Sequence, residues 1–142
     1  MGESMESLMG SIYKRIGKGE NEAARQEERL IPALRSIMRP LEGASCRGKI
    51  TGSCGETMEV YLKIRDERVE DATFVTDGCQ FSVICGYLAT HFSKGKTVDE
   101  AIQIGGDTLL MILGSLPESE THCAYLAAEA LHAAIHDWML KE

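Results

Sequence analysis

Three short segments of this 142-residue chain combine residue types that bind metals. They are Cys54-Gly55-Glu56, Gly78-Cys79 and His122-Cys123. Thiolate, carboxylate and imidazole groups hold zinc, iron or an iron-sulfur cluster, and glycine lets the backbone approach such a group closely. The three segments therefore predict metal-sulfur chemistry.

Each of these cysteines is predicted to lie at the end of a structural element. Residues 57–64 alternate apolar and polar side chains, and residues 69–76 are rich in β-branched side chains. Together they predict an antiparallel hairpin that begins just after Cys54 and turns around Asp66-Glu67. From Phe81 onward the apolar residues recur at helical spacing, so Cys79 is expected at a strand-to-helix junction.

The last helix is predicted from an apolar stripe that begins at Cys123 and ends at Trp138. A helix start offers unpaired N–H groups and a partial positive charge, and both stabilise a thiolate. We therefore expect Cys123 to have the lowest pKa of the cysteines and to be a good nucleophile.

Two further cysteines are interpreted as packing residues. Cys85 shares a helical stripe with Ile84 and Leu88, so it is expected to be a small buried side chain. Cys46 precedes a first strand predicted at residues 49–51, and packing is the better explanation there as well.

Two other side chains, Glu56 and His122, compete for the fourth ligand position beside the three thiolates. Stable electron-transfer clusters are usually held by four thiolates, whereas a carboxylate or imidazole gives one weaker and exchangeable ligand. Tetrahedral zinc accepts the same set of three thiolates with either side chain. These residues alone leave iron-sulfur and zinc occupancy open.

Several segments also resemble those of a known family, in the same order and at the same spacing. They are Cys54-Gly55-Glu56, Thr76-Asp77-Gly78-Cys79, the stretch 94–101 (KGKTVDEA), Leu116-Pro117 and the stretch 122–127 (HCAYLA). Over residues 46–142 the chain resembles the NifU/IscU-type iron-sulfur cluster scaffold proteins.

This resemblance implies a small α+β domain of the SufE/NifU-like kind, in which a short antiparallel sheet of about three strands packs against several helices. It implies a scaffold and not an enzyme. Such proteins accept persulfide sulfur from a cysteine desulfurase, combine it with iron into a labile [2Fe-2S] cluster and transfer the cluster to apo-proteins. By this resemblance Cys54, Cys79 and Cys123 are cluster ligands, Cys123 is the main sulfur acceptor, and Glu56 and His122 complete the metal site.

Two of the departures from the family pattern concern the site and its partners. Glu56 stands where an aspartate is usual, so its carboxylate arm is one methylene longer. Relatives that use a dedicated chaperone typically carry Leu-Pro-Pro-Val-Lys, whereas residues 116–120 read LPESE and place Glu120 at the lysine position. This reversal of charge counts against the chaperone partnership.

Two other functions fit the cysteines. In the first, the cysteines bind a structural zinc that only stabilises the fold and takes no part in sulfur delivery. Alternatively, a zinc-bound Cys123 could carry persulfide without building a cluster, although the zinc-dependent branch of the family has an additional segment between its second and third cysteines. The 44 residues from Cys79 to Cys123 leave no room for that segment, which favours the cluster scaffold.

The composition indicates one folded domain with a helical N-terminal extension. Residues 46–142 form the predicted scaffold domain, and residues 1–45 are predicted to be helices that pack on or beside it. The net charge of −7 counts against nucleic acid and anionic membranes as partners. Five cysteines and no export signal indicate free thiols in the cytoplasm.

Overall fold

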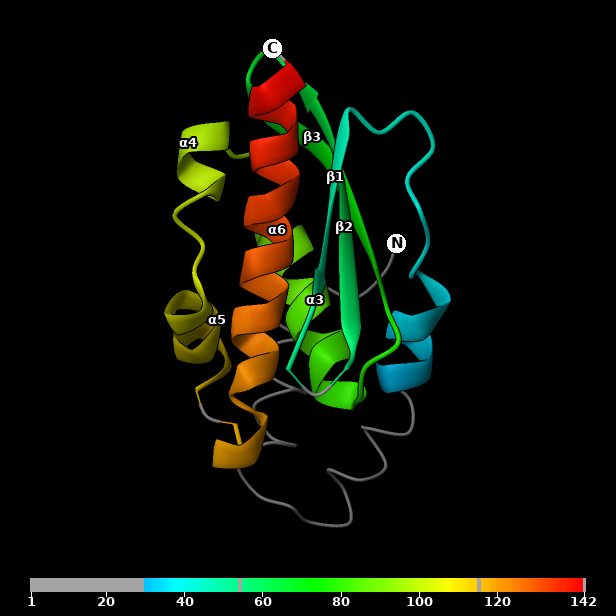
Figure 1. Cartoon of the computed structure of the whole chain (residues 1–142), viewed down its shortest axis with the longest axis vertical. Helices are drawn as coiled ribbons and strands as arrows, with labels where there is room; N and C mark the ends of the chain where they lie inside the picture. The colour runs from blue at the N-terminus through cyan, green and yellow to red at the C-terminus, as the bar shows by residue number, and fades with distance from the viewer. Residues whose placement is uncertain (1–29, 54, 115, 142) are drawn as a thin grey trace.

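A three-stranded antiparallel sheet in the order β1-β2-β3 organises the fold of the computed structural model, which describes residues 30–53, 55–114 and 116–141 (Figure 1). The strands are β1 (Cys46–Thr51), β2 (Thr57–Arg65) and β3 (Arg68–Thr76). The first strand begins at Cys46, three residues before the predicted start, because Cys46 already pairs with Leu62 of β2.

The predicted hairpin is confirmed, and its turn consists of two residues. Asp66 and Glu67 connect the paired residues Arg65 and Arg68 and have φ angles of 54° and 61°. Two successive residues in the left-handed region give a turn whose twist matches the right-handed twist of the strands. The polar tip therefore closes the hairpin without glycine.

Helices cover the sheet. They are α3 (Gln80–Ser93), α4 (Val98–Ala101), α5 (Gly106–Leu113), the 3₁₀ turn η1 (Glu118–Glu120) and α6 (His122–Lys141). Helix α6 packs on β1 and β2, helix α3 packs on β3 and against α6, and α5 packs against α6. This arrangement confirms the predicted α+β fold class.

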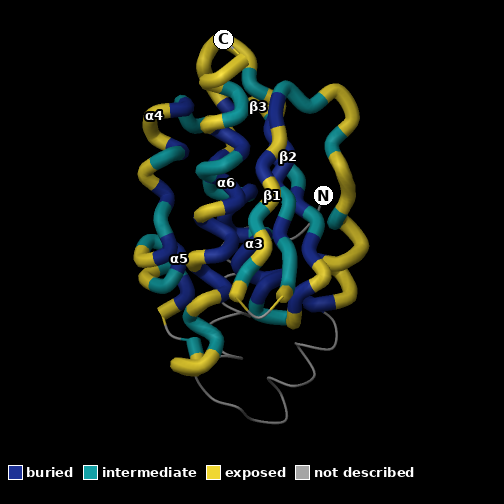
Figure 2. Tube along the Cα trace, viewed as in Figure 1, coloured by how far each residue is buried: buried dark blue, intermediate teal, exposed yellow. Residues whose placement is uncertain are grey.

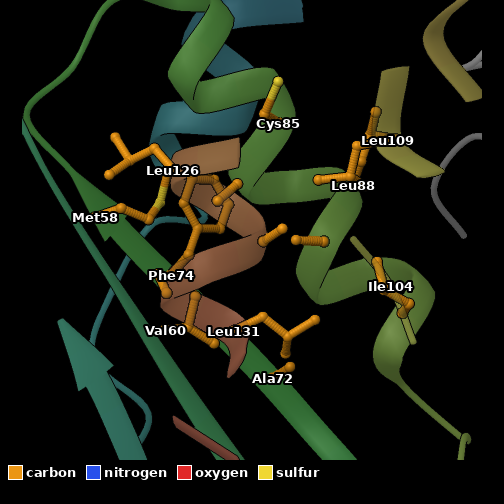
Figure 3. Packing of buried hydrophobic residues seen from close by; sticks show 14 of the residues in the cluster. Met58, Val60, Ala72, Phe74, Cys85, Leu88, Ile104, Leu109, Leu126 and Leu131 are labelled. Atoms are coloured by element: carbon orange, nitrogen blue, oxygen red, sulfur yellow. The ribbon is translucent and has the colours of Figure 1, made fainter. Parts of the chain in front are cut away.

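The core lies between the sheet and these helices. In β2 the alternating residues Met58, Val60 and Leu62 are fully buried, as the period of two predicts. Figure 3 shows how side chains of the strands meet those of α3 and α6, and Figure 2 shows the buried stretches along the elements that face one another. Cys85 and Cys46 belong to this core, which confirms that both pack.

The chain also contributes to the core before the sheet begins. Residues 30–36 are helical, and Leu30, Ile31 and Leu34 are buried in the same apolar cluster. The earlier helix predicted for the N-terminal extension lies outside the described residues. The division into 1–45 and 46–142 remains a prediction.

Among the described residues, none of the helices combines the length and the apolar character needed to cross a membrane.

Helix α6 lies very close to the sheet at Gly48 of β1. A Cβ atom at this position would overlap backbone atoms of Ala130, Ala133 and Ala134. Because backbone atoms cannot rotate away as a flexible side chain can, only glycine allows the helix to lie this close to the strand. Gly48 therefore sets the distance between β1 and α6.

We predict that Gly48→Ala destabilises the protein by about 1–3 kcal/mol, since the added methyl group must push α6 away from the sheet. Urea unfolding followed by circular dichroism measures the change. Gly52→Ala is the control, because a Cβ at Gly52 meets other atoms only at 3.6 Å or more, which is ordinary van der Waals contact. A Gly48→Ala variant as stable as this control would contradict the close-contact argument.

Candidate metal centre

Most of the predicted site residues come together at one end of the sheet. Glu56 precedes β2, Cys79 immediately precedes α3, and His122 and Cys123 open α6. The ends of these elements meet at the lower end of the view in Figure 1. Cys54 lies outside the described residues.

The two described cysteines of the site differ in exposure. Their sulfur atoms are 4.0 Å apart. Cys79 is exposed at the N-cap of α3, whereas Cys123 is fully buried. The hydroxyl of Ser82, also fully buried, donates a hydrogen bond of 3.3 Å to the Cys123 sulfur. The pair thus has one thiol at the surface and one beneath it.

His122 connects the carboxylate of Glu56 with the Cys123 sulfur. Its Nε2 atom lies 3.3 Å from Glu56 Oε1 and 3.7 Å from Cys123 Sγ. Its Nδ1 atom lies 3.1 Å from the carbonyl oxygen of Ser119, so an N–H there would donate to that oxygen and leave Nε2 with a lone pair. A neutral imidazole in this tautomer can bind a metal through Nε2.

The carboxylate of Glu56 is largely buried, with 12% of its side chain exposed. Although Oε1 is at ion-pair distance from His122, no described donor makes a hydrogen bond to it. A buried carboxylate oxygen without a hydrogen bond is costly, and a cation removes that cost. The donor set at this point therefore fits a metal ion.

A tight loop before β2 places Glu56. The N–H of Gly52 donates to the Glu56 carbonyl oxygen at 2.7 Å, and the N–H of Gly55 donates to the Gly52 carbonyl oxygen at 2.9 Å. Gly55 has a φ angle of 90°, which favours glycine. The N–H of Thr57 then donates to Asp77 at 2.7 Å, which ties this loop to the end of β3 and lowers the pKa of Asp77.

Gly78 brings the loop and α3 close together. A Cβ atom at this position would lie 2.5 Å from Glu56 Oε2 and 2.6 Å from Ser82 Oγ. The absent side chain thus leaves room for the carboxylate directly beside Cys79. This is the physical reason for glycine in the Gly78-Cys79 segment.

The lowered pKa expected for Cys123 is wrong for the metal-free protein. Burial raises the pKa of this thiol well above its ordinary value, and the hydrogen bond from Ser82 offsets only part of that effect. Nearby negative charge at Cys79, Cys85 and Glu56 raises the pKa further. The argument from the helix start omitted the cost of burying a thiolate.

One site residue was not predicted as a ligand. The Oε2 atom of Glu120 lies 3.7 Å from the sulfur of Cys79 and 3.7 Å from that of Cys123. Glu120 precedes Cys123 by three residues, a spacing that puts two side chains on one face of a helix. This spacing could have indicated that Glu120 lies beside Cys123. It does so only if the helical turn begins before His122, at Glu120 or earlier.

Two groups of donor atoms in the described residues are compact enough for a metal ion. One consists of Glu56, His122 and Cys123, and the other of Cys79, Glu120 and Cys123. Within each group the donor atoms lie within 4.8 Å of one another, and the groups share Cys123. Soft sulfur combined with nitrogen and oxygen suits zinc, iron and similar divalent ions.

Comparison with known proteins identifies the family. The sequence model of the NifU-like N-terminal domain matches residues 41–142. The chain belongs to this family. Its fold is also that of a NifU-like protein (N-terminal) from Brucella abortus, with a TM-score of 0.66 and 18% identity over 95% of this chain and 99% of that one. This likeness agrees with the predicted NifU-like fold.

Curated relatives carry iron-sulfur names. The chain is 43% identical over 88 residues to the iron-sulfur cluster assembly scaffold protein IscU 1 of Archaeoglobus fulgidus, a match that covers 62% of this chain and 58% of that protein. It is 37% identical over 99 residues to the iron-sulfur cluster assembly protein IscU of Plasmodium falciparum, covering 70% of this chain and 59% of the relative. The chain thus spans somewhat more than half the length of these relatives.

We predict that iodoacetamide labels Cys79 at least about tenfold faster than Cys46 or Cys85 in the folded, metal-free protein at neutral pH. Cys79 is exposed, whereas burial raises the pKa of Cys46 to about 11 and that of Cys85 to about 12. Each unit of pKa removes about nine tenths of the reactive thiolate. Timed alkylation with peptide mass mapping measures the three rates, and the urea-unfolded chain provides the control in which they should converge. Equal rates in the folded protein would refute the burial argument.

Proposed function

We propose that this chain is a scaffold on which iron-sulfur clusters are assembled and from which they are transferred. The observation that carries this proposal is the convergence of Cys79, Cys123, His122 and Glu56 at one end of the sheet. Membership of the NifU-like N-terminal domain family supports it, as do the scaffold names of the IscU relatives. In this role the chain binds and releases a cluster and catalyses no reaction of its own.

The proposed ligands are the thiolates of Cys54, Cys79 and Cys123, with Glu56 or His122 at the fourth position. Cys54 is included among the ligands because of its place in the sequence, two residues before Glu56. A [2Fe-2S] cluster held in this way has one oxygen or nitrogen ligand, which exchanges more readily than a thiolate. Zinc fits the same donors and is the expected occupant when iron and sulfide are absent.

Sulfur is proposed to arrive as a persulfide on a cysteine desulfurase. The Cys123 thiolate attacks the terminal sulfur of the donor persulfide, an S–S bond forms on Cys123, and the donor cysteine leaves as a thiolate. No net oxidation occurs in this step. Since Cys123 is fully buried, its side of the site must open when the donor docks.

Cluster formation needs electrons as well as iron and sulfur. Two persulfide sulfurs take up four electrons to become two sulfides. Two ferrous ions supply two of these electrons as they become ferric, and the other two come from a dithiol that becomes a disulfide or from two molecules of a one-electron donor protein. The finished cluster then passes to apo-proteins. Docking of the dedicated chaperone is not part of the proposal, because Glu118 and Glu120 make residues 116–120 acidic.

Free thiols require a reducing compartment, so we place this activity in the cytoplasm.

Two other functions compete with the scaffold. In one, a zinc-bound site passes on persulfide without building a cluster. In the other, a tightly held zinc only closes the fold. All three use the same cysteines, and reconstitution separates them.

Anaerobic incubation with ferrous iron, cysteine, dithiothreitol and a cysteine desulfurase should give the protein the visible absorption of a [2Fe-2S] cluster, and the cluster should move to an apo-ferredoxin. Cys79→Ser should reduce cluster yield to about a tenth or less, since one thiolate ligand is lost. Cys46→Ala, which removes a buried thiol outside the site, is the control and should retain the yield. Metal analysis that finds only tightly held zinc would overturn the scaffold proposal.

The Glu56→Ala variant should still bind a cluster, because His122 can complete the site, but should release it several-fold more slowly, since the exchangeable carboxylate is gone. The rate of transfer to apo-ferredoxin, followed by circular dichroism, measures this. Glu59→Ala is a control that removes a nearby carboxylate on β2 outside both donor groups. An unchanged transfer rate in Glu56→Ala would place Glu56 outside the ligands.

A further inference from the structure

Glu120 brings a second carboxylate to the two cysteines. Its Oε2 atom is 3.7 Å from each sulfur, and the sulfurs are 4.0 Å apart. One oxygen therefore faces both thiols in a nearly equilateral triangle. Glu56 and His122 belong to the other group, so Glu120 is not a substitute for either of them.

These separations match those around a bound metal ion. For a tetrahedral ion with metal–sulfur and metal–oxygen distances of about 2.3 and 2.1 Å, two sulfurs lie about 3.8 Å apart and a sulfur and an oxygen about 3.6 Å apart. The triangle of Cys79, Glu120 and Cys123 differs from this by only one or two tenths of an ångström on each side. An ion could enter with almost no rearrangement of the three donors.

The backbone before α6 holds Glu120 in place. The 3₁₀ turn of residues 118–120 ends two residues before the helix, and the N–H of Glu120 donates to the Pro117 carbonyl oxygen at 2.8 Å. The Thr121 hydroxyl donates to the Glu118 carbonyl oxygen at 3.1 Å. Because the turn leads directly into α6, the carboxylate of Glu120 and the sulfur of Cys123 lie on the same side of the first turn of this helix.

Exposure separates Glu120 from the buried donors. Glu120 is half-buried and Cys79 is exposed, whereas Cys123 lies beneath them. An ion that arrives from solvent thus meets Glu120 and Cys79 before it reaches the Cys123 sulfur. A carboxylate attracts a hydrated divalent cation and can replace part of its water shell, while the thiolates supply the stronger bonds.

We propose that Glu120 is a metal ligand, which together with Cys79 and Cys123 receives a divalent ion before sulfide is present. The identity of that ion as ferrous iron rests on the proposed scaffold function. The ligand role of Glu120 does not, because the same donors suit zinc and cobalt. Glu120 thereby adds a metal position to the one formed by Glu56, His122 and Cys123.

Cobalt(II) is the probe for the test, since its visible bands report the number and type of ligands. The full chain, reduced and free of metal, is titrated with cobalt(II) without oxygen, and a competing chelator gives the dissociation constant. The variants are Glu120→Gln, which keeps the shape of the side chain, and Glu120→Lys, which reverses its charge. Glu118→Gln is the matched control, because it removes the same charge from the same exposed turn and belongs to neither donor group.

Glu120→Gln should weaken cobalt binding at least about tenfold and alter the ligand-field bands, and Glu120→Lys should weaken it further. The sulfur-to-cobalt absorption of the bound form should persist, as both thiolates remain. Glu118→Gln should bind within about twofold of the unaltered protein, since an exposed charge outside the donor groups contributes little. Equal unfolding midpoints of the metal-free variants would show that the fold is intact.

Cobalt binding by Glu120→Gln that equals that of Glu118→Gln in affinity and spectrum would overturn the ligand role of Glu120. The same result for Glu120→Lys would overturn it independently, even if one of the variants were less stable. Neither titration contains sulfide or a desulfurase. A result that overturns the ligand role of Glu120 therefore does not affect the proposal that the chain assembles clusters. Conversely, failed reconstitution in a protein whose cobalt site depends on Glu120 would overturn the scaffold proposal alone.

Discussion

The close contact between β1 and α6 is the constraint on which the proposed metal centre depends. Gly48 lets the backbone of α6 lie directly on the strand, and Ala130 and Ala134 on the facing side of the helix are fully buried. With the helix fixed along the sheet, its first turn lies where β2 begins and β3 ends. His122 and Cys123 therefore reach the other site residues through backbone packing.

The site formed in this way has an inner and an outer half. Glu56 and Cys123 are largely or fully withdrawn from solvent, whereas Cys79 is exposed. The inner carboxylate lacks a hydrogen bond at Oε1 among the described residues, and burial makes the inner thiol difficult to ionise. The first feature favours a bound cation, because a cation would satisfy the carboxylate oxygen. The second means that an ion has to displace the proton of the Cys123 thiol before it can stabilise the thiolate.

The sequence predicted the framework better than the chemistry. Alternation around Val60 and the helical stripe through Cys85 predicted a strand and a helix correctly, because burial of one face leaves a regular pattern. The prediction for the pKa of Cys123 failed, since its thiol is buried where α6 packs against α3, an element distant in sequence. Glu120 was missed because a 3₁₀ turn, which leaves no periodic pattern, directs its carboxylate toward the two sulfurs.

The central claim is that thiolates from the starts of α3 and α6 bind one metal ion together with oxygen or nitrogen donors. X-ray absorption at the zinc edge of protein loaded with one equivalent of zinc tests this most directly. The structure predicts two or three sulfur neighbours at about 2.3 Å and the remaining ligands, oxygen or nitrogen, at about 2.0–2.2 Å. A first shell that contains only oxygen and nitrogen would contradict the account.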